Sequence, residues 1–486
     1  MSEANEINYF SMMEILEYLY KQDLPGNNEN SKNDYMSIMN TYLLEYAKKL
    51  KKKDFDVMLS EVSQFSMREF GEVNNHYKAI HGYKTKGMLF GRKNLYPLMI
   101  NTLEQVNYFA SVLFTFDTHA HLSDLSSIIN HYSGKNELYE KSKKKERSSI
   151  KVCINSLNSI IEKEKSYSRL GVKNIAICAT MSSGKSTLVN ALLGNDVLPA
   201  RNEATTAKIT SVYDKDGLKH LKGFCNRTHE KLFSYDIDLE DLDLWNSDKE
   251  IEHIYIQGDL DGIKNTTKYS IAVHDTPGTN NSLDNSHYKT TMEFLQNEKI
   301  DLLIYVANFE QMLTKDEQYL LKEIYSNVIN TKKIPIMFVI NKLDSYDKQK
   351  EDYKEVITKF ISNLETLGYK QYKILPVAAK PARLIKMALC GKSSQFTENE
   401  CDTFASILNK FTKRININEL SNKKVLYDDS LIYGNMGGNT IVIDGESYEI
   451  KKLRQALINT GLVSVEKTIG EYIESEEKNG RYSVEI

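Results

Sequence analysis

The stretch that most constrains this chain is C-A-T-M-S-S-G-K-S-T-L-V-N-A-L-L-G, residues 178–194. It matches the phosphate-binding pattern G-x-x-x-x-G-K-[ST], except that Ala179 replaces the first glycine. Residues 172–178 form an apolar run typical of a buried parallel strand. Residues 185–193 repeat apolar side chains at helical spacing, and Gly194 follows them as a stop signal. A strand, a tight loop and a helix in this order predict an anion site at the start of the helix.

The residues of this loop have different predicted roles. A methyl group at Ala179 is tolerated at the strand exit if its φ is negative, whereas Gly184 lies where the backbone meets phosphate. Lys185 is predicted to reach the β- and γ-phosphates, and the Ser186 hydroxyl to ligate Mg²⁺. The loop residues predicted to bind the nucleotide are Met181, Ser182, Ser183, Gly184, Lys185, Ser186 and Thr187.

Two further motifs follow apolar, strand-like segments. Asp275 and Gly278 end I-A-V-H-D-T-P-G, and Asn341, Lys342 and Asp344 end I-P-I-M-F-V-I-N-K-L-D. In a doubly wound sheet the carboxyl ends of the strands border one crevice, so these motifs are expected beside the loop. There Asp275 would hold a Mg²⁺-bound water, and the Gly278 amide would meet the γ-phosphate. The Asp344 carboxylate only accepts hydrogen bonds, which suits the N1–H and N2–H₂ donors of guanine, so the predicted nucleotide is GTP.

The motifs S-S-G-K-S-T-L-V-N-A-L-L-G, L-P-A-R-N-E-A-T-T-A-K-I-T (198–210), D-T-P-G and N-K-L-D together resemble the dynamin superfamily, specifically bacterial dynamin-like GTPases. The resemblance covers about residues 150–480. It implies an α/β fold: a P-loop GTPase domain with a doubly wound, mostly parallel sheet and flanking neck-like helices. The helical spacing of apolar residues before it adds an N-terminal helical domain to this fold class. It also implies hydrolysis of GTP to GDP and phosphate with Mg²⁺. A threonine of the switch would ligate that ion; Thr206 is the first choice and Thr205 the alternative. The predicted metal ligands are therefore Ser186, Thr206 and Asp275.

The chain departs from the family pattern at two places. Relatives often carry a polar residue, commonly Gln, where this chain has Met181, which accepts hydrogen bonds poorly. The attacking water must then be positioned by a backbone carbonyl, by Thr206 or by a partner molecule. The last guanine-binding element appears as V-A-A-K, so Ala379 and Lys380 are the expected base contacts there.

Catalysis requires compensation of the charge that builds on the transferring phosphoryl group. Lys185, Ser182 and Thr206 are the residues predicted to take part. Besides Lys185, Arg201 in the switch is the candidate cation supplied by the chain itself. The resemblance implies that Ser182 helps to hold a cation such as K⁺, and that the GTPase domains dimerise across their active sites in the triphosphate state.

Composition limits the other classes of function. A net charge of −3 with a pI near 6.4 argues against a nucleic-acid binder. The five cysteines show no metal-binding spacing, and the N-terminus lacks the features of a signal peptide, so a cytoplasmic protein is expected. The apolar stretch 98–116 favours a core helix over a membrane contact.

Two local patterns and four larger parts make up the predicted organisation. An amphipathic helix is expected over 453–474, and D-G in 434–450 predicts a β-hairpin. The insertion that contains this hairpin is equally consistent with a partner-binding flap and with a passive decoration. The parts are an N-terminal helical domain (1–135), a neck-like helix (136–170), a dynamin-type GTPase domain (171–450, with the insertion near 392–450) and a C-terminal helix packing on the neck (451–486).

Two functions are compatible with this organisation. In the first, the nucleotide cycle drives self-association or movement of the helical domain, at a membrane or in an assembly. In the second, the chain is a regulatory GTPase switch, or one subunit of a heteromer, that acts on a protein partner. The expected partners are GTP and GDP, a second copy or another dynamin-like protein, and a peripheral membrane contact, which would place the chain in the cytoplasm or on the inner membrane.

Overall fold

The chain divides into two compact units, residues 1–169 and 170–486. The computed structural model describes most of the second unit. Nearly all of the expected N-terminal domain and of the neck-like helix lies outside the described residues. Arg201, Thr205 and Thr206 also lie outside them. The described residues are 171–198, 208–218, 220–227, 231–234, 236–263, 265–279, 285–345, 352–421, 425 and 439–479, with Phe10, Lys163, Ser166, Tyr167, Arg169 and Leu170.

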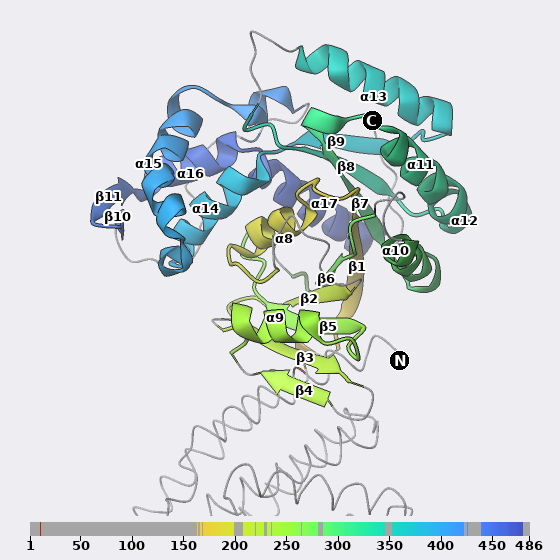
Figure 1. Ribbon diagram of the computed structural model, residues 1–486, viewed down its shortest axis with the longest axis horizontal. Helices are drawn as coiled ribbons and strands as arrows, with labels where there is room; N and C mark the ends of the chain where they lie inside the picture. Colours follow the sequence, from red (N-terminus) through yellow and green to blue (C-terminus); the bar gives the residue numbers. More distant parts are fainter. Residues whose placement is uncertain are drawn as a thin grey trace, which may run out of the picture. The chain divides into compact units, whose positions relative to one another are not determined.

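The second unit is built on a nine-stranded sheet with the order β4-β3-β5-β2-β6-β1-β7-β8-β9 (Figure 1). Neighbouring strands are parallel from β6 to β9 and between β2 and β5, whereas β2–β6, β3–β5 and β3–β4 are antiparallel. The predicted α/β fold with a mostly parallel, doubly wound sheet is therefore confirmed. The strands are β1 (Gly171–Cys178), β2 (Ile209–Asp214), β3 (Lys222–Asn226), β4 (Lys231–Ser234), β5 (His253–Gly258), β6 (Tyr269–Asp275), β7 (Leu302–Asn308), β8 (Ile336–Asn341) and β9 (Tyr372–Pro376).

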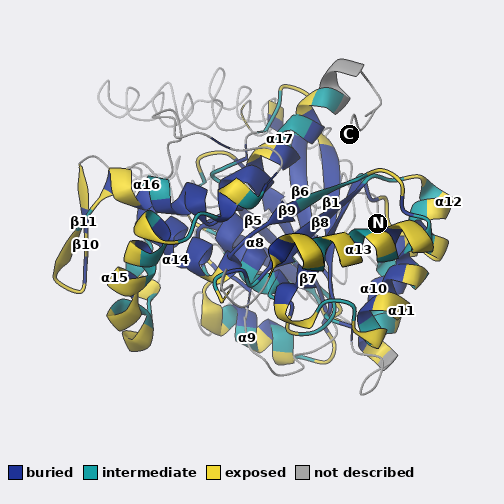
Figure 2. Cartoon of the chain, turned by 90° about the horizontal axis from the view of Figure 1, so that it is seen from above, coloured by how far each residue is buried: buried dark blue, intermediate teal, exposed yellow. Residues whose placement is uncertain are grey.

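The central strands are buried on both faces, as their dark blue colour in Figure 2 shows. Every residue of β7 and β8, and all of β1 after Gly171, is buried. Such strands are continuous apolar runs because helices cover both sides of a parallel sheet. Their register pairs Ile177 with Asp275, and Asn308 with Asn341. The phosphate-binding loop and both downstream motifs therefore leave the sheet at the same edge.

The helices flank this sheet on two sides. In both views α10 to α13 lie to one side of the sheet, and α14 to α16 lie to the other (Figures 1 and 2). The α-helices are α8 (Lys185–Leu193), α9 (Leu239–Ser247), α10 (Asn285–Asn297), α11 (Lys315–Ile324), α12 (Asn330–Lys332), α13 (Tyr353–Leu367), α14 (Ala379–Leu389), α15 (Glu398–Lys413), α16 (Ile450–Asn459) and α17 (Leu462–Asn479). Short 3₁₀ turns cover Phe309–Gln311, Ser393–Gln395 and Ile417–Leu420, and a π-helical turn covers Tyr325–Ile329.

The C-terminal segment differs from the single helix expected over 453–474. Gly461 separates α16 from α17 with a φ of +85°. A Cβ at this position would lie 2.2 Å from the carbonyl oxygen of Pro376, so this close approach requires glycine. The Tyr472 hydroxyl of α17 donates to the Asp301 carbonyl at 2.6 Å, which fixes α17 on the GTPase unit. Packing of this segment on the neck-like helix stays a prediction.

The predicted hairpin is present as β10 (Thr440–Ile443) and β11 (Glu446–Glu449), paired antiparallel. Asp444 (φ +48°) and Gly445 (φ +79°) form its turn, as the D-G signal predicts.

Candidate nucleotide-binding site

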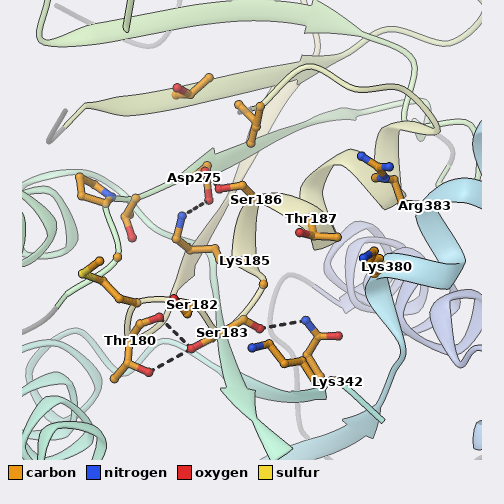
Figure 3. A pocket seen from close by; sticks show the side chains of 18 of the residues that line it. Thr180, Ser182, Ser183, Lys185, Ser186, Thr187, Asp275, Lys342, Lys380 and Arg383 are labelled. Carbon is orange, nitrogen blue, oxygen red and sulfur yellow. Dashed lines mark hydrogen bonds and ion pairs between the residues drawn. The ribbon is translucent and has the colours of Figure 1, made fainter. Parts of the chain in front are cut away.

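The loop between β1 and α8 borders an open cavity of about 590 Å³. Its backbone is left-handed at Ser182 (φ +58°) and Gly184 (φ +83°), an arrangement that turns successive amides toward one concavity. The Ser183 hydroxyl donates to the Thr180 carbonyl at 2.7 Å and lies 3.0 Å from the Thr180 hydroxyl (Figure 3). These bonds hold the loop open before any anion is bound.

The loop is also tied to the D-T-P-G segment that follows β6. The Met181 N–H donates to the Thr279 carbonyl, and the Thr279 N–H donates to the Ala179 carbonyl, each at 3.2 Å. Ala179 is fully buried and has no positive φ, so its methyl group fits where the pattern has glycine. A Cβ at Gly278 would meet the Met181 Cα at 3.3 Å, which shows how closely the two segments pack.

Asn341 joins the phosphate-binding loop to the segment after β9. Its Nδ2 donates to the Ser183 carbonyl at 2.9 Å, and its Oδ1 accepts from the Ala379 N–H at 2.9 Å. A Cβ at Gly184 would lie 2.3 Å from the Asn341 Nδ2, so a glycine is required there by contact as well as by φ. Asn341 therefore fixes the distance between the two ends of the cavity.

Lys185, Ser186 and Asp275 point toward one another at the base of the loop (Figure 3). The Lys185 ammonium forms a buried ion pair with the Asp275 carboxylate. The Ser186 hydroxyl donates to the other Asp275 oxygen at 3.0 Å. Each charge is thus compensated by its neighbour in a site that water reaches poorly. An anion in the cavity would compete with Asp275 for the ammonium.

The same oxygens suit a hard divalent cation. Mg²⁺ prefers oxygen ligands and usually keeps several waters beside one or two protein groups. The Ser186 hydroxyl and the Asp275 carboxylate lie within hydrogen-bonding distance at the cavity wall, so a cation could contact both, directly or through water. The donor set therefore fits Mg²⁺, although Thr206 lies outside the described residues.

The structure brings most of the predicted residues to this one cavity. Ala379 does not line it; the residue is fully buried and contributes its N–H to Asn341. Thr205 and Thr206 are outside the described residues. The predicted residues that line the cavity are Met181, Ser182, Ser183, Gly184, Lys185, Ser186, Thr187, Asp275, Gly278, Asn341, Lys342, Asp344 and Lys380.

An ionic cluster in the cavity wall was not predicted. Arg383 of α14 donates through one nitrogen to both carboxylate oxygens of Asp196, each at 2.9 Å, and pairs through its other terminal nitrogen with Glu400 of α15. Arg383 lies on the same helix as Lys380 (Figure 3). Burial raises the pKa of Asp196, the Arg383 charge lowers it, and the Glu400 charge raises it again. The spacing of these residues in the sequence carries no signal for this cluster.

Lys208 and His287 are among the other unpredicted residues that line the cavity. Lys208, just after the switch, donates to the Trp245 carbonyl at 2.5 Å and also to the Asp248 carbonyl. It thereby caps the C-terminus of α9, and burial lowers its pKa. His287 of α10 lies 3.3 Å from the Gly278 carbonyl through its Nδ1.

A buried polar network lies among β1, β2, β5 and β6, next to the strand end that carries Asp275. The Ser211 hydroxyl lies 2.6 Å from the His274 Nδ1 and 2.6 Å from the His253 Nε2, and the His274 Nε2 lies 2.9 Å from the Asn174 Oδ1. Burial lowers the pKa of each imidazole to about 3, so both rings are neutral at pH 7. Neutral rings can hydrogen-bond through this chain without placing a charge in the core of the sheet.

The fold and the cavity define a phosphate-binding-loop nucleotide-binding domain. Residues 175–343 match the sequence model of the dynamin family. An uncharacterised protein of Caldicellulosiruptor sp. is 28% identical over 301 residues, which are 60% of this chain and 68% of that protein. Dynamin-like protein A of Bacillus subtilis is 23% identical over 198 residues, which are 39% of this chain and 15% of that protein. The chain thus spans a small part of that longer relative.

A solved structure of an oligomerised bacterial dynamin pair is 18% identical, with a TM-score of 0.36 over 96% of this chain and 78% of that one. Together with the site, the family match indicates that residues 175–343 lie in a GTPase domain similar to those of the dynamin family, and the chain is similar to bacterial dynamin-like proteins. None of the described helices combines the length and apolar character that crossing a bilayer requires.

Proposed function

We propose that this chain binds GTP in the described cavity and hydrolyses it to GDP and phosphate. The observation that carries the proposal is the convergence of three motifs on one cavity. Lys185, Ser186 and Asp275 line one part of it, and Asp344 and Lys380 line another. Each motif alone occurs in other proteins, but their meeting at the carboxyl edge of one sheet is specific to nucleotide-binding sites of this kind.

At the phosphate end, binding is an exchange of partners. The incoming phosphates displace Asp275 from the Lys185 ammonium, while the amides around Ser183 and Gly184 donate to the phosphate oxygens. Mg²⁺, when bound, neutralises charge on the β- and γ-phosphate oxygens. Ser186 and the released Asp275 would hold that ion, with Thr206 or Thr205 as the further ligand.

At the base end, Asp344 accepts from the N1–H and N2–H₂ groups of guanine. Adenine has an acceptor at N1, so it would face the carboxylate without a hydrogen bond. Lys380 would pack along the base, Lys342 also lines the cavity, and Asn341 keeps both ends in register through its bonds to Ser183 and Ala379.

Hydrolysis also requires a positioned water and a further positive charge near the γ-phosphate. Met181 cannot position the water through its side chain, and Ser182 is exposed where the loop borders the cavity. We infer that a second copy of the chain closes this side, so that Ser182 and a bound K⁺, or Arg201, complete the site. Exclusion of water by the partner would strengthen these contacts and couple hydrolysis to self-association.

GTP hydrolysis by the full chain tests the proposal. Lys185→Ala should abolish GTP binding or lower turnover by at least about 100-fold, because it removes a preorganised charge from the phosphate site. Lys354→Ala, at an exposed position of α13, is the matched control and should keep wild-type turnover. Wild-type turnover in Lys185→Ala would refute the assignment of the loop.

Self-association has its own test. The GTPase rate per molecule should rise with protein concentration, and dimers should appear in native mass spectra with GDP and a fluoride mimic of the phosphoryl group. A flat specific activity with monomers in every nucleotide state would favour the regulatory switch, or a heteromer with a different partner. Co-sedimentation with liposomes, with and without nucleotide, decides whether a peripheral membrane contact belongs to the function.

A further inference from the structure

Helix α15 belongs to the region expected to be an insertion, yet it is firmly anchored to the GTPase unit. Phe404, Leu408 and Phe411 form its buried face. Its first turn is closed by a capping box between Thr397 and Glu400, and the Asn459 Nδ2 of α16 donates to the Phe411 carbonyl near its end at 2.7 Å. A helix held in this way at both ends has a fixed position on the GTPase unit.

The N-terminal end of α15 reaches the wall of the nucleotide cavity. One Glu400 oxygen accepts from the Thr397 N–H at 3.0 Å, and the other pairs with Arg383. Arg383 is bound in turn to Asp196, which follows the phosphate-binding helix α8. The side chains of all three charged residues are at most 16% exposed, so the network holds the start of α15 against α14 and the end of α8.

The C-terminal end of α15 reaches the base-reading motif. The Lys410 ammonium donates to the backbone carbonyl of Asp344. Ten residues separate Glu400 from Lys410, which corresponds to about 15 Å along a helix. One helix therefore connects the wall beside α8 with the segment that carries Asp344.

The other contacts of the Asp344 segment with described residues come from its own neighbours and from the end of β9. Leu343 is fully buried and its N–H donates to the Val377 carbonyl at 3.4 Å, while the Ser345 hydroxyl donates to the Lys342 carbonyl at 2.8 Å. Lys342 has a φ of +66°, a conformation that a lysine adopts under restraint from its surroundings. The Lys410 bond is thus a tie to Asp344 itself from outside the motif.

We propose that α15 is a specificity-determining part of the nucleotide site, in which Lys410 is the positioning residue for Asp344. The proposal rests on the GTP-binding function proposed above. Recognition of guanine by a carboxylate needs two directional hydrogen bonds, to N1–H and N2–H₂, and such bonds weaken steeply when the geometry degrades. Loss of the Lys410 bond would leave the Asp344 segment free to shift. Both hydrogen bonds of the Asp344 carboxylate, to N1–H and to N2–H₂, would then weaken.

The experiment compares GTP with inosine triphosphate, which lacks the N2 amino group. In Lys410→Met, the affinity for GTP should fall about tenfold, a typical effect of one degraded polar contact at a specificity site. The affinity for inosine triphosphate should fall less, so the ratio of the two affinities should shrink at least about threefold. The KM for GTP should rise while kcat at saturation stays within about twofold, because the phosphate end is untouched.

Two variants act as controls. Lys413→Met changes an exposed lysine on the same last turn of α15 and should behave as wild type. Lys410→Arg keeps a long donor and should restore most of the GTP preference. If Lys410→Met fails to fold, as judged by circular dichroism, Lys410→Gln replaces it, because this side chain stays polar but is too short to reach the carbonyl.

The outcomes separate this inference from the proposed function. Equal losses for both nucleotides, or an unchanged ratio, would overturn the role of Lys410 while leaving the GTPase assignment intact. A wild-type chain that does not prefer GTP to inosine triphosphate would overturn the N2-directed bond of Asp344 on which this inference depends, whereas a wild-type chain that does not bind or hydrolyse GTP would refute the proposed function itself.

Discussion

The ion pair between Lys386 of α14 and Glu466 of α17 offers a quantitative test of how the C-terminal helix is held. Both side chains are buried, with exposed fractions of 0% and 1%. The Lys386 ammonium lies 2.5 Å from the Glu466 carboxylate and also donates to the carbonyls of Leu192, in the last turn of α8, and Leu260. A Cβ at Gly262 would lie 2.2 Å from the carboxylate carbon of Glu466, so the backbone there leaves no spare room.

The perturbation is a double-mutant cycle with Glu466→Leu, Lys386→Met and the pair of them. Removing one partner leaves a buried charge without its counter-ion, which costs about 3–5 kcal/mol in the free energy of unfolding. In Glu466→Leu two carbonyls still contact the ammonium, but they carry no net charge. The double variant replaces both charges by apolar groups of similar volume. It should lose about 1–2 kcal/mol, because the Leu192 and Leu260 carbonyls lose a donor. The coupling energy between the two residues should therefore be at least about 4 kcal/mol.

The assay uses the single tryptophan of the chain, Trp245. This residue is buried in α9 of the same unit, so its fluorescence reports unfolding of the GTPase domain by urea independently of the N-terminal unit. Each single variant should lower the urea midpoint strongly, and the double variant should recover much of that loss. Additive effects, or single variants that each cost less than about 1 kcal/mol, would show that the pair does not hold α17 as described.

Three further predictions follow from the described contacts. Gly184→Ala should abolish GDP binding in calorimetry, because its Cβ would meet the Asn341 Nδ2 at 2.3 Å. The control is Gly217→Ala, which has a similar φ of +78° but open space around it and should keep full binding. Glu317→Gln tests a buried carboxyl whose pKa burial raises from 4.5 to about 7. Native Glu317 keeps its proton to a higher pH than the unfolded chain does. The free energy of unfolding of the wild type should therefore decrease as the pH rises from 4.5 to 7. The variant should therefore gain up to about 3 kcal/mol over wild type from pH 5 to pH 8 in urea unfolding, and a constant difference would contradict this. Asp344→Asn should weaken GTP and improve xanthosine triphosphate relative to it by about 1–3 kcal/mol; an unchanged affinity ratio would mean that another residue reads the base.

The sequence by itself determined the class of fold and the residues at both ends of the cavity. The loop around Gly184 and Lys185 is contiguous, so its anion-binding geometry follows from local backbone chemistry and from the strand and helix that flank it. Asp275 and Asn341 could be placed beside it because parallel strands end at one edge of a doubly wound sheet. The D-G turn at Asp444 was likewise predictable, because its backbone conformation selects those residue types locally.

Only the tertiary structure decided which side chains support this site. Arg383 meets Asp196 across 187 residues of sequence, Lys386 meets Glu466 across 80, and Lys410 meets Asp344 across 66. Such partners are chosen by the packing of α14, α15 and α17 around the sheet, and no local pattern encodes them. The end of α16 at Gly461 could not be predicted either, because the apolar spacing of α16 continues into α17. The close contact of Gly461 with the Pro376 carbonyl exists only in the folded chain.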